Sequence, residues 1–227
     1  MSFIQRLKDP DFVLKGCHIA WQKWPHEITS AVYDKVWRNF LRDGDNKPDW
    51  HVRLGLAYLM LLDWNMVLFM NKPERMQRLR KDIIEAYEDT KTDLQVLEGL
   101  HLGSDCFELY RDKIESVYYT WSYKASIGMT GASKALHFLI PWLFVPWDKG
   151  ISEFYHSACR HPTHRIGGYA CYGYFMETCN DIASALLSKN GSIIYLHPAY
   201  KARGDIRTIP KMIDECNFAW IQKGERW

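Results

Sequence analysis

The stretch between Leu54 and Met70 constrains the fold most strongly, because it is apolar on nearly every side. A helix with this pattern must be buried all round, either in a lipid bilayer or in the core of a protein. Its length comes close to the roughly 20 residues that a membrane-spanning helix needs. Asp63 and Asn65, however, would place an acid and an amide in the lipid, at a high cost in free energy. The stretch therefore predicts a central helix in the core of a protein that has no membrane contact.

Amphipathic helices are predicted around this central helix. Apolar residues recur at the helical period of 3.6 between Ile28 and Leu41. Similar patterns, each bounded by Gly, Pro, Asn or Asp, cover residues 73–89, 107–124, 169–187 and 210–221. A strand pattern is confined to residues 192–196. The sequence predicts an all-α fold in a single domain over residues 1–227, either compact or bilobed.

Composition leaves several functional classes open. The 227 residues, 47% of them hydrophobic, are enough to form one sizeable core. The net charge of +2 neither requires nor excludes a polyanionic partner. The N-terminus lacks a basic region followed by an apolar run, so a cytoplasmic location is expected. The six cysteines are scattered without a CxxC pair, and we expect reduced thiols packed in the core.

Chemistry is suggested by one segment, residues 128–151. Gly128 and Gly131 permit a tight turn, and Thr130 or Ser133 could cap a helix that begins there. The free N–H groups and the dipole at a helix start attract anions. These four residues are therefore candidate phosphate-binding residues.

An acid follows the same segment after two prolines. The helix that contains Lys134 should end near Pro141, and Pro146 should begin a second turn. Asp148 then lies at the predicted start of another helix, whose dipole would stabilise its ionised form. In the simplest interpretation, Asp148 caps this helix and Lys134 is solvated.

The segment also resembles the helix-hairpin-helix motif and the following acid of the base-excision DNA glycosylase superfamily. The matching residues are Gly131, Lys134, Pro146 and Asp148. The resemblance implies that the amides of residues 128–133 hold a DNA phosphate. It also implies that Asp148 activates water or orients a nucleophile at a flipped nucleotide, and that Lys134 attacks the sugar if the strand is cleaved.

A glycosylase would also need a pocket for the extruded base, which such enzymes hold between aromatic or apolar side chains. Aromatic residues make up 15% of the chain, and the candidates for this pocket are Trp142, Trp147 and Tyr172. The function expected from the resemblance is DNA binding or DNA processing by cleavage of an N-glycosidic bond, without a cofactor. In that function, the basic residues of the stretch 72–81 contact phosphates; otherwise they form the solvated face of a helix.

Two other functions stay open. The chain could be a non-catalytic helical interaction protein, in which the aromatic residues serve packing. It could also be a protein supported by zinc, because imidazole and thiolate are ligands that zinc prefers. The candidate ligands are His156, Cys159, His161 and His164, and the alternative for them is surface histidines beside a buried thiol.

Overall fold

Helices make up most of the computed structural model. The model describes residues 2–23, 48–64, 72–158, 165–166, 169–170, 172–191, 194–195 and 207–224. Within these residues, the regular structure consists of nine α-helices, one short π-helix and four two-residue strands. The predicted all-α fold is confirmed.

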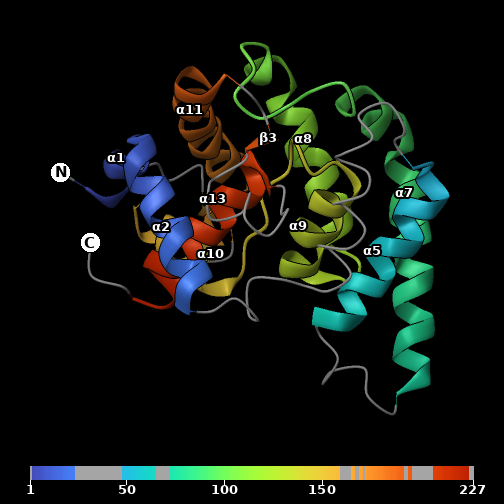
Figure 1. The fold of residues 1–227 in the computed structure, drawn as a ribbon. Helices are drawn as coiled ribbons and strands as arrows, with labels where there is room; N and C mark the ends of the chain where they lie inside the picture. Colours follow the sequence, from blue (N-terminus) through green and yellow to red (C-terminus); the bar gives the residue numbers. More distant parts are fainter. Residues whose placement is uncertain are drawn as a thin grey trace.

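The elements follow one another along the chain as shown in Figure 1. The helices are α1 (Phe3–Leu7), α2 (Pro10–Lys23), α5 (Trp50–Trp64), α7 (Pro73–Leu97), α8 (Phe107–Ser122), α9 (Gly128–Leu139), α10 (Lys149–Ala158), α11 (Tyr172–Asn190), α13 (Ile209–Asn217) and the π-helix η2 (Phe218–Gln222). Two antiparallel pairs of strands join β1 (Arg165–Ile166) to β2 (Tyr169–Ala170), and β3 (Ile194–Tyr195) to β4 (Arg207–Thr208).

The helices pack in two groups, and α11 joins them. One group contains α5, α7, α8 and α9, and the other contains α1, α2, α10, α13 and η2. Figure 1 shows the first group on the right and the second on the left. α11 contacts α8 of the first group and both α2 and α13 of the second. One cluster of buried apolar residues extends through both groups. The extent of a single domain over residues 1–227 stays a prediction.

The apolar helix α5 packs on α9 and α7 but is not buried all round. Its buried face includes Ala57 and Met60, whereas Val52 is 45% exposed and Leu59 is 50% exposed. The prediction of a fully buried helix is therefore wrong on one face, and residues 65–70 lie outside the described residues. None of the helices in the described part of the chain has the length and apolar character that crossing a membrane requires.

Helical periodicity located the other described helices well. The buried residues of α7 and α8 recur three or four positions apart, as the amphipathic pattern predicts. α7 continues beyond the predicted end to Leu97, and α11 begins at Tyr172 because Tyr169 and Ala170 form β2. The predicted strand at 192–196 corresponds to β3. The predicted helix over 28–41 lies outside the described residues.

The four described cysteines carry free thiols, as predicted. Cys17, Cys179 and Cys216 are buried, and Cys106 is partly exposed. Burial raises the pKa of the Cys179 thiol well above its usual value, so this thiol stays protonated and unreactive. Cys159 and Cys171 lie outside the described residues.

A buried link of irregular backbone, residues 140–148, connects α9 to α10. Most of its residues are inaccessible to solvent, and buried backbone polar groups need hydrogen-bond partners. Side chains from neighbouring helices supply them. The Tyr172 hydroxyl donates to the carbonyl of Val145 at 2.8 Å, and the Nδ1–H of His137 donates to the carbonyl of Phe144 at 2.7 Å. The link is therefore held in one path across the core.

Candidate functional site

Lys134 and Asp148, the two predicted catalytic residues, are brought together by the fold. Lys134 lies in the second turn of α9, and Asp148 immediately precedes α10. Lys211 and Asp214 of α13 complete the group. Their charges and that of Asp148 all influence the pKa of the Lys134 amine. We call these four residues the Lys134 cluster.

The predicted glycine turn is confirmed in part, because Gly128 has a positive φ whereas Gly131 lies inside α9. α9 begins at Gly128, so Thr130, Gly131 and Ser133 lie inside it. The expectation that Thr130 or Ser133 caps the helix is wrong, because the capping position is Ile127. Gly128 has a φ of 64°, a conformation that favours glycine, and it lets the chain turn from α8 directly into α9.

Gly131 leaves room chiefly for the side chain of Ile127, the residue that precedes α9. A Cβ atom at this position would lie 3.2 Å from the Cγ2 of Ile127 and 3.8 Å from the Cδ2 of Leu61. Gly131 and Ser133 are buried, whereas Gly128 and Thr130 are partly exposed. The phosphate-binding role of these four residues stays a prediction, and Gly128 and Thr130 are the two that a phosphate could reach directly.

Burial disfavours the charged forms of both Lys134 and Asp148. It lowers the pKa of the Lys134 amine below its usual range, with the opposing influence of Asp214 and Asp148 too weak to compensate. It also raises the pKa of the Asp148 carboxyl, although the N–H of Ile151 favours the carboxylate. Transfer of a proton from the amine to the carboxylate is therefore less unfavourable here than in water.

Asp148 also caps α10, as the simplest interpretation of the sequence proposed. Its Oδ1 accepts a hydrogen bond from the N–H of Ile151 at 2.9 Å. The second half of that interpretation is wrong in part, since Lys134 is partly buried and not fully solvated. The N–H of Gly150 also favours the Asp148 carboxylate.

Charged residues of α13 and β4 were missed by the sequence analysis. The Lys211 amine lies 2.6 Å from the Oδ2 of Asp214. Next to this pair, the Nε of Arg207 donates to the Oε1 of Glu215 at 3.0 Å, and both side chains are almost fully buried. The available signal was the spacing of Lys211, Asp214 and Glu215, three and four residues apart on a helix whose other positions are largely apolar.

His137 is a further buried polar residue close to the Lys134 cluster. Its side chain is inaccessible to solvent, and burial lowers its pKa to about 4. The imidazole is therefore neutral at pH 7, and its bond to the Phe144 carbonyl requires the proton on Nδ1. His137 supports the buried link and adds no positive charge to the cluster.

The three candidate residues for a base pocket do not line one open cavity. Trp147 is 1% exposed and Tyr172 is fully buried. The Trp147 indole donates to the Tyr118 hydroxyl at 3.0 Å, and Tyr118 stacks on Tyr172 with ring centroids 3.8 Å apart. The partly exposed Trp142 instead donates to the carbonyl of Glu98, near the end of α7. The base-pocket role stays a prediction, and it would require Trp147 and Tyr172 to move out of the core.

The zinc hypothesis also stays a prediction. His156 lies in α10, and its buried Nδ1 has no hydrogen-bond partner among the residues that the structure describes. Cys159, His161 and His164 lie outside the described residues. Within the described ranges, no group of three His, Cys, Asp or Glu side chains is arranged to hold a metal ion. Elemental analysis of the purified protein tests the hypothesis directly.

The fold and the Lys134 cluster define an all-α protein with a partly buried lysine between two carboxylates. Comparison of the chain with protein-family models, with curated proteins and with solved structures finds no match. The resemblance to the glycosylase superfamily therefore rests on the residues of the segment 128–151.

Proposed function

We propose that the chain processes DNA, using Lys134 as an amine nucleophile at the sugar of a flipped nucleotide and Asp148 as the acceptor of its proton. The observation that carries this proposal is the lowered pKa of Lys134 beside Asp148. A lysine becomes a nucleophile when burial or a neighbouring charge favours its neutral amine. Lys134 and Asp148 also occupy the positions that the glycosylase resemblance assigns to this chemistry.

The proposed reaction forms a bond between the Lys134 amine and C1′ of the sugar while the bond from C1′ to the base breaks. The base leaves with the bonding electrons and takes up a proton. Asp148 accepts the proton that the amine loses, which its raised pKa favours. Opening of the sugar ring then converts the adduct into a Schiff base, and water hydrolyses it to restore the lysine. The reaction as written uses no metal and no organic cofactor.

Phosphate contacts would position the nucleotide. The first turn of α9 offers the backbone N–H group of Thr130, and a helix start favours an anion, whereas the N–H of Gly128 donates to the carbonyl of Lys124 at 3.0 Å. Lys134 lies one to two turns further along the same helix. We propose the cytoplasm as the location of this reaction.

Reductive trapping tests the role of Lys134. The wild-type protein, incubated with DNA that carries an abasic site and then with borohydride, should form a covalent adduct. Lys134→Ala should abolish the adduct. Lys149→Ala is the matched control, because Lys149 is close in sequence but its side chain is 73% exposed and pairs with Glu153. An adduct of equal yield in Lys134→Ala would refute the proposed nucleophile.

A separate variant tests Asp148. Asp148→Asn keeps an oxygen that can cap α10 but cannot accept a proton at neutral pH. Release of a damaged base should fall by about 10²–10⁴-fold, the usual contribution of a general base. DNA binding and the melting temperature should stay near the wild-type values. Unchanged base release would remove Asp148 from the mechanism.

A second candidate function is that of a non-catalytic helical interaction protein. It is favoured by the use of Asp148 as a cap and by the burial of Trp147 and Tyr172 in the core. A DNA titration at several salt concentrations separates the two functions, because phosphate contacts make affinity fall steeply with salt. If neither duplex nor single-stranded nor damaged DNA binds at low salt, the DNA-processing function is excluded and this second function is preferred.

A further inference from the structure

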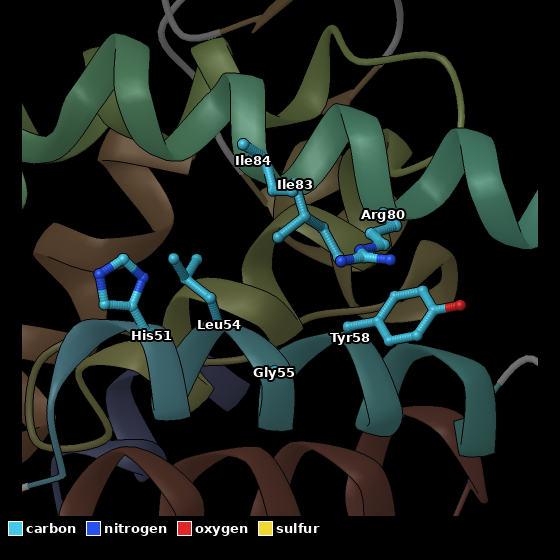
Figure 2. A pocket seen from close by; sticks show the side chains of 7 residues that line it. All are labelled: His51, Leu54, Gly55, Tyr58, Arg80, Ile83 and Ile84. Carbon is cyan, nitrogen blue, oxygen red and sulfur yellow. The ribbon is translucent and has the colours of Figure 1, made fainter.

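A groove of about 450 Å³ separates α5 from the first half of α7. Figure 2 shows His51 at one end of this groove and Tyr58 with Arg80 at the other. Leu54 and Ile83, both almost fully buried, lie between these ends and form an apolar floor. All the residues that line the groove belong to α5 and α7, and none of them is a member of the Lys134 cluster.

Gly55 leaves the middle of the groove open. Among the described residues, a Cβ atom added at this position would meet no atom of a neighbouring side chain or element within 4 Å, so they leave the space above the backbone open. Glycine is unfavourable inside a helix by about 1 kcal/mol relative to alanine. No close contact with another described residue requires its presence here.

The apolar surface extends beyond the groove onto both of its edges. Val52 and Leu59 of α5 lie beside Gly55 on the helix surface and are half-exposed, as is Ile84 of α7. An isolated exposed apolar side chain is ordinary, but a group of them around an apolar groove marks a surface that binds a partner. Because α5 is apolar on nearly every side, this face is the part of the helix that the described fold leaves uncovered.

The charge at the edge of the groove is positive. Arg80 is exposed and makes no ion pair within the described residues, and the Tyr58 hydroxyl beside it makes no hydrogen bond within the same residues. Both groups are available to a carboxylate. His51 adds a further polar group at the other end.

We propose that this groove binds an amphipathic helix of a partner protein, with one apolar side chain inserted above Gly55 and an acidic residue paired with Arg80. A third helix laid along two packed helices covers both edges of the groove at once, which explains why Val52, Leu59 and Ile84 are exposed together. A small ligand that filled only the groove would leave these edges uncovered. The acidic residue follows from the charge of Arg80.

Selection from a displayed library of random helical peptides tests the proposal with the full-length protein. Enriched peptides should share apolar residues three and four positions apart, with an acidic residue at a fixed offset. Gly55→Trp should weaken their binding by at least about tenfold, which corresponds to roughly 1.4 kcal/mol. Because the space above Gly55 is open, this variant should keep the wild-type melting temperature.

A charge reversal provides the second arm of the test. Arg80→Glu should change the selected peptides from acidic to basic at the same offset. Val96→Trp is the matched control, because Val96 is a half-exposed residue of α7 outside the groove. The proposal is overturned if no enriched peptide depends on Gly55 and Arg80. It is also overturned if decanoate, a small apolar carboxylate, binds with this dependence and no peptide does.

Discussion

Ser133 and Trp147 are joined by hydrogen bonds that hold α9 against the end of the buried link. The backbone N–H of Trp147 donates to the Ser133 Oγ at 3.1 Å. The hydroxyl proton of Ser133 has two acceptors within reach, the carbonyl of Trp147 at 3.1 Å and that of Thr130 at 3.0 Å. Each of the two joined residues is followed directly by a residue of the Lys134 cluster. The contact therefore fixes how Lys134 and Asp148 lie relative to each other.

Ser133→Ala should destabilise the protein and loosen the cluster. The substitution leaves the buried N–H of Trp147 without its partner, which costs roughly 1–3 kcal/mol in the free energy of unfolding. Urea denaturation measures this loss. In Ser157→Ala the change should stay within about 0.5 kcal/mol, because Ser157 is exposed and its hydroxyl donates to the Phe154 carbonyl of its own helix. Equal stability of the two variants would show that the Ser133 contact does not hold the link.

The buried His137 should make the protein sensitive to mild acid. Its pKa is about 4 in the folded protein against 6.5 in the unfolded chain. Between these values the unfolded chain binds a proton that the folded protein excludes, so the free energy of unfolding falls as the pH falls. The loss from this residue should reach about 2 kcal/mol by pH 5.

Urea titrations at pH 7 and pH 5 measure this dependence. His137→Gln retains a group that can donate to the Phe144 carbonyl but does not titrate, so its stability should fall less between the two pH values. His51→Gln, which changes an exposed histidine, should behave like the wild type. If His137→Gln loses as much free energy of unfolding as the wild type between pH 7 and pH 5, groups other than His137 cause the loss.

Two helical glycines should respond to alanine in opposite directions. A Cβ atom on Gly16 would lie 2.4 Å from the Nε1 of Trp220 and 2.8 Å from the Sγ of Cys216, so α2 would have to move away from α13. Gly16→Ala should therefore lose about 1–3 kcal/mol. Gly55→Ala meets open space and should gain about 0.5–1 kcal/mol from helix propensity. Thermal unfolding should show a lower melting temperature for Gly16→Ala and a higher one for Gly55→Ala. A higher melting temperature for Gly16→Ala would contradict the close contact of Gly16 with Trp220 and Cys216.

Local patterns predicted the helices and the place of Asp148, because periodicity and proline act within a few residues. The roles of the glycines were not predictable in the same way. A glycine pair fits a turn, the first residue of a helix or a close contact. Gly128 takes the positive φ of a turn at the first residue of α9, and Gly131 leaves room for the side chain of Ile127.

The partners of Lys134 show the second limit of sequence analysis. Asp214 and Lys211 follow Lys134 by more than 70 residues, and nothing local indicates that these residues of α13 lie close enough to act on Lys134. The same holds for the aromatic residues. Trp147 and Tyr172 suit a core as well as a ligand pocket, and their burial is decided by the helices that surround the link.

Arg53 joins three elements at the other end of the buried link. Its guanidinium donates to the carbonyl of Leu139 at 3.1 Å, to the carboxylate of Glu98 at 2.6 Å and to the carbonyl of Pro48 at 2.8 Å. The Leu139 carbonyl belongs to the last turn of α9, where Pro141 prevents the helix from continuing. Arg53 therefore satisfies a buried helix end and joins it to α5 and α7.

Arg53→Leu should lose about 3–5 kcal/mol in the free energy of unfolding, the cost of breaking a buried ion pair by removing one partner. Arg53→Lys keeps the charge but cannot make three directed bonds, so its loss should be smaller. Arg78→Leu replaces an exposed arginine of α7 and should change stability by less than about 0.5 kcal/mol. Urea denaturation ranks the three variants. If Arg53→Leu ranked with Arg78→Leu, the end of α9 would have to be held by other contacts, and the buried link would not depend on Arg53.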